Sequence, residues 1–193
     1  MSMPQFPRTQ RPARFTLVTG GTRSGKSRFA VELAKTFGRR VVYVATCQPA
    51  DAEMRQRIVR HRRTRPDYWI TIERPANLPS LLARLNAKSD GVLFDCLTMY
   101  VSDLLMKRRS DAAIQRDIRQ LCEAIRRVKF PLVMVTNEVG SGVVPDHPLG
   151  RRFRDVAGMA NQVAARYADR VVFMVSGIPL VVKNSSVISG RIR

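Results

Sequence analysis

The sequence predicts an α/β fold of the P-loop NTPase (RecA-like) type, with a mostly parallel sheet flanked by helices and a C-terminal hairpin. Short, continuously apolar runs such as FTLVTG, VVYVAT and PLVMVTN are typical of strands that are buried on both faces. These runs alternate with segments of helical hydrophobic spacing, which favours a parallel sheet covered by helices. The glycine-rich GGTRSGKS directly follows the first run, as in the strand-loop-helix unit that binds phosphates.

The strands are expected where apolar and β-branched residues form short runs that end at glycine or at a polar residue. In chain order, they are expected at residues 15–20, 41–46, 69–73, 91–96 and 131–137. The chain closes with two further runs, RVVFMVSG and IPLVVK. Gly177 separates these runs, which predicts the two strands of a hairpin, with a β-bulge as the alternative.

The helices are expected where apolar residues recur every three to four positions. Such spacing predicts helices at residues 26–37, 78–85 and 149–167, and a polar helix from about residue 50 to 63. Between the strands at 91–96 and 131–137, an amphipathic helix is expected from the spacing of Ile114, Ile118, Leu121, Ile125 and Val128.

The length of 193 residues and the hydrophobic content of 45% are enough for one domain with a full core. We expect this domain over residues 15–183, a flexible basic arm over 1–14 and a basic tail over 184–193. No apolar run reaches the roughly 18–20 residues of a membrane span, and the first residues lack the apolar region of a secretory signal. The three cysteines are widely spaced and fit neither a disulfide framework nor a zinc site, so we expect a cytoplasmic protein.

The net charge of +19 implies anionic partners, which are either small polyphosphates or nucleic acid. The positive charge is distributed over many segments, so a large part of it also fits an ordinary solvated surface. No basic stretch is interleaved with aromatic residues of the kind that stack on bases. Because of this missing pattern, nucleic acid is not the expected partner. The high positive charge keeps a P-loop ATPase that binds nucleic acid as an alternative.

The loop GGTRSGKS matches the phosphate-binding motif G-x-x-x-x-G-K-[ST]. Its glycines let successive backbone N–H groups point at phosphate oxygens, and the following helix adds its positive N-terminal end. Lys26 is expected to reach the β- and γ-phosphates, and Ser27 to ligate Mg²⁺. The predicted nucleotide-binding residues here are Gly20, Gly21, Thr22, Arg23, Ser24, Gly25, Lys26 and Ser27.

A P-loop enzyme also needs an acidic residue at the end of a neighbouring strand for its metal ion. The run GVLFDC places Asp95 there, which makes Asp95 the second candidate for Mg²⁺. The alternative is that Asp95 caps a helix that begins at Leu97. The segment TNEVG follows another strand but lacks the N-K-x-D of signalling GTPases, so that class is disfavoured.

One of the two histidines, His61, lies in the arginine-rich stretch RIVRHRRTRP. One interpretation is a solvated basic helix face, and the other is a nucleophile beside a polyphosphate. A nucleophilic imidazole must be neutral, and neighbouring guanidinium groups disfavour its charged form. Helical spacing would place Arg57 and Arg65 on the face of His61 and would turn Arg62 elsewhere. For the second histidine, His147, a structural or solvent role is favoured over a substrate contact.

Several segments together resemble the family of bifunctional adenosylcobinamide kinases / adenosylcobinamide-phosphate guanylyltransferases of cobalamin biosynthesis. They are GGTRSGKS, YVATCQ, RIVRHRRTRP, TNEVGSGVVP, FRDVAGMANQ and VSGIPLVVK. The resemblance implies that the protein phosphorylates adenosylcobinamide with a nucleoside triphosphate, and that it then transfers GMP from GTP to the resulting phosphate. It also implies that His61 carries the GMP during transfer, with Lys26 as the second catalytic residue.

The same resemblance implies further contacts to the nucleotide, with GTP and ATP as substrates and Mg²⁺ as cofactor. The implied positions are Thr46, Cys47, Gln48, Arg62, Arg63, Thr64, Arg65, Glu73 and Asp95. A corrinoid is the implied second substrate, bound by a homotrimer. A protein that retains only one of the two activities, and a nucleotide sensor without catalysis, remain as alternatives.

Overall fold

The computed structural model describes residues 13–47, 52–85 and 88–185. A seven-stranded sheet runs through its centre, with the strand order β3-β2-β4-β5-β1-β6-β7. The strands are β1 (Phe15–Gly20), β2 (Val41–Ala45), β3 (Ile70–Glu73), β4 (Gly91–Asp95), β5 (Leu132–Val135), β6 (Arg170–Val175) and β7 (Ile178–Asn184). The first six strands pair in parallel and β7 pairs antiparallel with β6. The predicted mostly parallel sheet is therefore confirmed.

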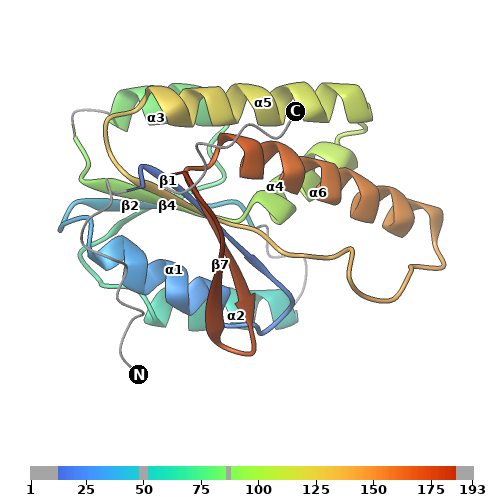
Figure 1. Ribbon diagram of the computed structural model, residues 1–193, viewed down its shortest axis with the longest axis horizontal. Coiled ribbons are helices and arrows are strands. Elements are labelled where there is room, and N and C mark those ends of the chain that lie inside the picture. Colours follow the sequence, from blue (N-terminus) through green and yellow to red (C-terminus); the bar gives the residue numbers. More distant parts are fainter. Residues whose placement is uncertain (1–12, 48–51, 86–87, 186–193) are drawn as a thin grey trace.

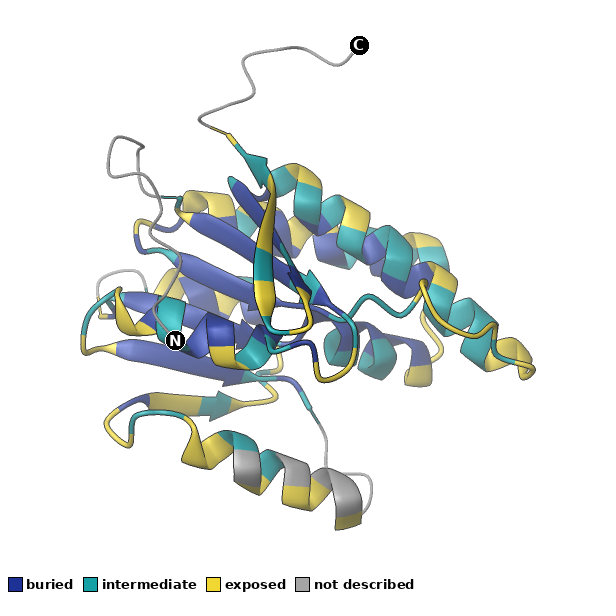
Figure 2. Cartoon of the chain, turned by 60° about the horizontal axis from the view of Figure 1, so that its bottom comes forward, coloured by how far each residue is buried: buried dark blue, intermediate teal, exposed yellow. Residues whose placement is uncertain are grey.

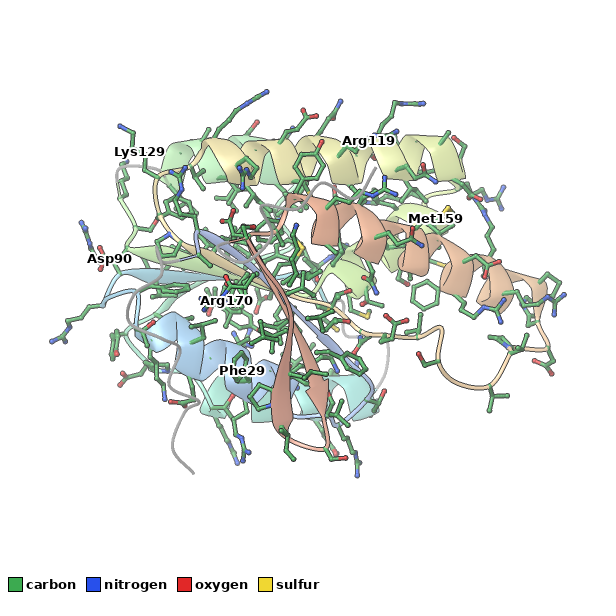
Figure 3. The ribbon with its side chains drawn as sticks, in the orientation of Figure 1. Phe29, Asp90, Arg119, Lys129, Met159 and Arg170 are labelled. Carbon is green, nitrogen blue, oxygen red and sulfur yellow. The ribbon has the colours of Figure 1, made fainter. Side chains whose placement is uncertain are left out.

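The helices cover both faces of this sheet, as Figure 1 shows. On one face lie α1 (Lys26–Lys35) and α2 (Ala52–Arg63). On the other lie α3 (Leu78–Leu85), α4 (Leu97–Met106), α5 (Asp111–Arg127) and α6 (Pro148–Tyr167). In Figure 3, Phe29 of α1 and Met159 of α6 mark these two opposite layers. The predicted helices are all present, with ends that differ by a few residues.

Alternation along each strand divides the core into two parts. Phe15 and Leu17 of β1 join the cluster under α3, α4, α5 and α6, whereas Val18 joins the cluster under α1. The predicted amphipathic helix is α5, which buries Ile114, Ile118, Leu121 and Ile125 and begins at the capping hydroxyl of Ser110. Burial on both faces is the reason that the central strands have continuously apolar sequences.

The C-terminal hairpin projects beyond the layers, and many of its side chains are exposed (Figure 2). Ser176 and Gly177 form its two-residue turn, and both have positive φ, of 50° and 85°. Two consecutive residues in this conformation are typical of a tight β-hairpin turn. The hairpin prediction is therefore confirmed, while the register shift lies elsewhere, between Val171 and Val172.

The proposed arm and tail lie largely outside the described residues. Arg14 belongs to the fold, because its N–H donates to Asp169 and its carbonyl accepts from Leu132. Asn184 is the last residue of β7. Within the described ranges, no helix combines the length and apolar character needed to cross a membrane.

Candidate functional site

A cavity of about 340 Å³ lies where the chain leaves the carboxyl ends of the parallel strands. Open α/β sheets bind their ligands at this edge. The cavity wall brings together eight of the predicted site residues. Lys26, Ser27, His61 and Asp95 are four of them. They come from the start of α1, from α2 and from the end of β4. Lys26 and Asp95, which are 69 positions apart in the chain, thus share one pocket because the central strands are parallel.

The predicted phosphate-binding loop, residues 20–27 between β1 and α1, is tightly built. A Cβ at Gly20, where φ is +155°, would lie 2.6 Å from the carbonyl oxygen of Met174, so this position requires glycine. Gly25 precedes α1 with φ of +93° and packs against the hairpin turn at Gly177. The N–H of Gly177 donates to the carbonyl of Ser24 at 3.0 Å. The hairpin therefore supports the loop from behind.

Two polar side chains of this loop are buried. Lys26 is 7% exposed, and its Nζ donates to the carbonyl oxygen of Gly21 at 2.8 Å. The Ser24 hydroxyl is buried and has no hydrogen-bond partner among the described residues. Thr22 and Arg23 are exposed at the tip of the loop. A buried hydroxyl and a buried ammonium beside a helix N-terminus suit an anionic ligand.

Asp95, at the end of β4, is held from the neighbouring strand. The Tyr43 hydroxyl of β2 donates to Asp95 Oδ2 at 2.7 Å. Burial, and next the charge of Asp95, raise the pKa of Tyr43, so this hydroxyl remains a donor. The alternative prediction, that Asp95 caps α4, is wrong. The residue that precedes α4 is Cys96, and no side chain caps that helix end.

Cys96 and Thr46 join the ends of β4 and β2. The Thr46 hydroxyl donates to the carbonyl of Cys96 at 2.7 Å and accepts from its N–H at 2.8 Å. Burial, and next the charge of Asp95, raise the pKa of the Cys96 thiol to about 12, so it stays protonated. Cys47, the next predicted residue, is partly exposed and lines the cavity. Gln48 lies outside the described residues.

His61 lies near the C-terminal end of α2 and lines the cavity. Helical spacing had predicted that Arg65 lies on the helix face of His61. This prediction is wrong, because the helix ends at Arg63. Arg65 reaches the cavity from the turn that follows, where its guanidinium carbon lies 3.3 Å from the centre of the Tyr43 ring. Burial lowers the pKa of Arg65, although a guanidinium stays charged at any working pH.

Arg62 also lines the cavity, which corrects the expectation that it points elsewhere. Its guanidinium pairs with Glu73 at the end of β3, and both side chains remain largely exposed. Arg63 and Thr64 are exposed and do not line the cavity, and the Thr64 hydroxyl donates to the carbonyl of His61 at 2.8 Å. Only the backbone of Arg57 lies within the described part of the chain.

A second hollow, of about 580 Å³, shares Arg62, Arg65 and Glu73 with the first. Trp69 and Thr71 complete much of its wall. The side-chain Nε of Arg65 and the indole nitrogen of Trp69 are buried without a hydrogen-bond partner among the described residues. The shared residues make the two hollows neighbours.

Sequence reasoning missed Asn137, which follows β5 and lines the cavity. Its backbone N–H donates to the Thr98 hydroxyl at 2.6 Å, and its carbonyl accepts from Asn161 at 3.0 Å. Thr136 links the same two side chains, with oxygen distances of 3.0 Å to Thr98 and 2.6 Å to Asn161. The polar end of PLVMVTN was a signal for this network, but its partners on α4 and α6 were not predictable from local sequence.

The second histidine caps α6. Its Nδ1 accepts a hydrogen bond from the N–H of Leu149 at 3.2 Å, and Pro148 is the first residue of the helix. This is the arrangement of an N-cap residue. The structural role expected for His147 is therefore confirmed.

The cavity has the charges and oxygen atoms that a metal-bound polyphosphate needs. Lys26, Arg62, Arg65 and Arg74 supply positive charge, and the Ser27 hydroxyl and the Asp95 carboxylate supply oxygen ligands. Oxygen is the donor that Mg²⁺ prefers, and Mg²⁺ uses few protein ligands when phosphates supply the others. Among the described residues, no cluster of three or more His, Cys, Asp or Glu side chains could hold a metal on its own.

The comparisons with known proteins agree on one family. The model of the cobinamide kinase / cobinamide phosphate guanyltransferase family matches residues 16–182. The chain is 41% identical over 179 residues to the bifunctional adenosylcobalamin biosynthesis protein CobU of Escherichia coli, covering 86% of this chain and 98% of that protein. The CobU protein of Salmonella typhimurium gives the same identity and coverage. The bifunctional protein CobP of Pseudomonas aeruginosa is 39% identical over 170 residues, covering 86% of this chain and 96% of that protein.

These matches extend over nearly all of the domain that contains the cavity, including β1, the phosphate-binding loop and the hairpin. The P-loop alone would fit many unrelated nucleotide-binding proteins. A family model that covers the whole α/β domain is far more specific. The chain therefore belongs to the cobinamide kinase / cobinamide phosphate guanyltransferase family.

Proposed function

We propose that the protein catalyses two consecutive reactions on a corrinoid substrate. It phosphorylates the hydroxyl group of adenosylcobinamide with a nucleoside triphosphate, and it then transfers GMP from GTP to adenosylcobinamide phosphate. The observation that carries the proposal is the presence of His61, Lys26, Ser27 and Asp95 in the wall of one cavity. Family membership over residues 16–182 supports the same pair of reactions.

The triphosphate is proposed to bind in the loop from Gly20 to Ser27. Backbone N–H groups at the start of α1 would bind its oxygens, and the Ser24 hydroxyl, which is buried without a partner among the described residues, can donate to one of them. Lys26 Nζ would turn from the Gly21 carbonyl to the β- and γ-phosphates. ATP and GTP are the proposed donors for the first reaction. The substrate hydroxyl oxygen bonds to the γ-phosphorus, the bond from the γ-phosphorus to the bridging oxygen breaks, the nucleoside diphosphate leaves and the hydroxyl proton is released to solvent.

Ser27 and Asp95 are proposed to hold Mg²⁺, because both line the cavity with oxygen atoms beside the predicted phosphate positions. When bound, Mg²⁺ would neutralise charge on the phosphates during transfer. The protein's own contribution is to fix these two oxygen ligands. The Asp95 carboxylate is oriented by Tyr43, and Ser27 is fixed by its place in the first turn of α1.

In the second reaction, a neutral nitrogen of His61 is proposed to attack the α-phosphorus of GTP. A nitrogen–phosphorus bond forms, the bond from the α-phosphorus to the bridging oxygen breaks, and pyrophosphate leaves with that electron pair. A phosphate oxygen of adenosylcobinamide phosphate then attacks the same phosphorus and releases the imidazole. Arg62 and Arg65 would neutralise charge on the leaving pyrophosphate, since both line the cavity with His61.

The guanine end is proposed to extend toward the second hollow, which shares Glu73 with the first. The Glu73 carboxylate can accept hydrogen bonds from the N–H groups of guanine or from the ribose hydroxyls. Its exposed ion pair with Arg62 is weak enough to be exchanged for such a ligand. Thr46 would contribute mainly its backbone, because its hydroxyl already bonds to Cys96. Cys47 would also contribute its backbone, since a thiol is a weak hydrogen-bonding group, and Gln48 is proposed as a further contact. Arg63 and Thr64 are proposed as further nucleotide contacts.

We further propose a homotrimer in the cytoplasm, where nucleoside triphosphates are available. The corrinoid would bind beside the cavity and partly between subunits. Size-exclusion chromatography with light scattering measures the number of subunits directly.

The decisive experiment is to incubate the protein with GTP labelled at the α-phosphorus. An acid-labile adduct is expected, and peptide mapping should place it on His61. His61→Ala should form no adduct and should still phosphorylate adenosylcobinamide. His147→Ala is the matched control, because His147 caps α6 and does not line the cavity. A persistent adduct in His61→Ala would contradict the assignment, and assays of each reaction with its own substrate would detect the loss of one activity.

A further inference from the structure

We propose that Tyr43 is a positioning residue for both halves of the nucleotide site, acting through its hydroxyl on Asp95 and through its ring on Arg65. The inference rests on the function proposed above for these two residues. It assigns a role to a strand residue whose sequence context, VVYVAT, indicates only a buried β-strand.

The sheet register explains why Tyr43 can reach both partners. Tyr43 pairs with Leu93 of β4 on one side and with Thr71 of β3 on the other. Two residues further along, Ala45 pairs with Asp95. Side chains two positions apart share a face of the sheet, so Tyr43 and Asp95 lie on the same face, with Tyr43 about 7 Å nearer the start of the strands. The length of a tyrosine side chain spans this distance and brings its hydroxyl to the carboxylate.

The hydroxyl contact is well formed and lies at the wall of the cavity, which both residues line. Tyr43 is 3% exposed, and its oxygen lies 2.7 Å from Asp95 Oδ2. The hydroxyl therefore holds one oxygen of this carboxylate in place. Because Asp95 also lines the cavity, this bond orients a carboxylate that a ligand there could meet.

The ring contact holds an arginine that has little other support. The guanidinium carbon of Arg65 lies 3.3 Å from the ring centre of Tyr43, within the range of a cation–π interaction. Its Nη1 lies 3.5 Å from the Thr71 hydroxyl, which is a weak contact. Its Nε is buried without a partner among the described residues. The ring therefore fixes the plane of the guanidinium while a donor remains for an anionic ligand.

Both contacts are made by one strand residue, so variants of Tyr43 should change two properties of nucleotide binding. The hydroxyl should affect the tightening of binding by Mg²⁺ through Asp95, and the ring should affect the affinity without metal through Arg65. Tyr43→Phe removes the hydroxyl and keeps the ring beside Arg65. Tyr43→Leu removes both. Tyr100→Phe is the matched control, because this partly buried tyrosine of α4 packs against Phe94 and does not line the cavity.

The test measures the affinity of each variant for a fluorescent GDP analogue, once in EDTA and once in excess Mg²⁺. In the starting protein, Mg²⁺ should tighten binding. Tyr43→Phe should reduce this tightening by about tenfold, as for loss of a residue that orients a metal ligand, and should leave the affinity in EDTA within about twofold. Tyr43→Leu should also weaken binding in EDTA by roughly threefold or more, because Arg65 loses its ring. Tyr100→Phe should change neither quantity.

An Asp95→Asn background shows whether the hydroxyl acts through Asp95. There, adding Tyr43→Phe should change the Mg²⁺-dependent tightening by less than about twofold. The same tenfold loss in both backgrounds would overturn the inference, as would Tyr43→Phe binding that matches the starting protein. If the starting protein forms the GMP adduct but shows no tightening by Mg²⁺, the metal role of Asp95 fails, and the positioning role of the hydroxyl fails with it. If no adduct forms, the proposed guanylyl transfer fails independently of Tyr43.

Discussion

The phosphate-binding loop and the helix that carries His61 face the same cavity but are supported very differently. The loop follows the central strand β1, which has β5 and β6 as neighbours, and the hairpin turn packs behind it. In contrast, α2 leads to the edge strand β3, and none of its described side chains is buried. The site therefore joins a rigid part, which would bind the triphosphate, to a lightly held part, which carries the proposed nucleophile.

This difference has a physical consequence for a two-step enzyme. Elements with few buried apolar contacts open at lower free energy than the core. A nucleophile on such an element can move relative to a nucleotide that the loop holds in place. The two proposed reactions take place at different phosphorus atoms of the nucleotide. The corrinoid hydroxyl attacks the γ-phosphorus in the first reaction, and His61 attacks the α-phosphorus in the second. A movable α2 beside a fixed loop suits this requirement.

The largest effect is expected from the rigid part. Lys26→Met removes the ammonium that lies beside the proposed phosphates and should reduce both activities by about 100- to 1000-fold, as for loss of a group that stabilises transition-state charge. Steady-state rates of each reaction, measured with its own substrate, give the two factors. Lys35→Met is the control, because this exposed residue of the same helix pairs with Glu32. An unchanged kinase rate in Lys26→Met would contradict a shared triphosphate site.

A pair of core and surface variants tests the difference in support directly. Ile118→Ala, at a position of α5 that is 0% exposed, should lower the free energy of unfolding by about 2–5 kcal/mol. Val59→Ala, at a position of α2 that is 49% exposed, should change it by no more than about 0.5 kcal/mol. Urea titration followed by circular dichroism measures both. A loss above about 2 kcal/mol in Val59→Ala would show that α2 is part of the cooperative core.

The rigid part was also the predictable part. The apolar runs of β1, β2, β4 and β5 identify buried strands without any tertiary information, and GGTRSGKS specifies its loop chemistry locally. Gly20 and Gly25 are required by contacts with Met174 and Gly177 that no local pattern shows. The motif expects glycine at both positions, and the positive φ that both residues adopt agrees with that expectation.

The lightly held part was less predictable, because its geometry depends on where elements stop. The prediction that Arg65 shares a helix face with His61 assumed a helix that continues past Arg63, where the chain instead turns toward Pro66. Arg62 pairs with Glu73 because β3 is the edge strand beside β2. Strand order and the register that joins Tyr43 to Asp95 are long-range properties, and local sequence does not contain them.

Hydrogen exchange can sharpen the contrast between the two parts. Without ligand, the amides of α2 should exchange at least about 100-fold faster than those of β1 and α1. If nucleotide binding requires an ordered α2, GDP at 100 times its dissociation constant should slow exchange in α2 by up to about 100-fold. Equal protection of α1 and α2 without ligand would remove the distinction between a rigid and a movable part.

The smallest effect is expected from the ion pair that joins α2 to β3. The side chains of Arg62 and Glu73 are 57% and 53% exposed, and exposed pairs contribute little to stability because water and salt screen them. A double-mutant cycle with Arg62→Ala and Glu73→Gln should give a coupling free energy of about 0–1 kcal/mol in urea titrations, lower at high salt. The same variants should weaken GTP binding more than they weaken folding, because both residues line the two hollows. A coupling well above about 1 kcal/mol would mean that this pair fixes α2 in place, and the nucleophile would then be as rigidly held as the loop.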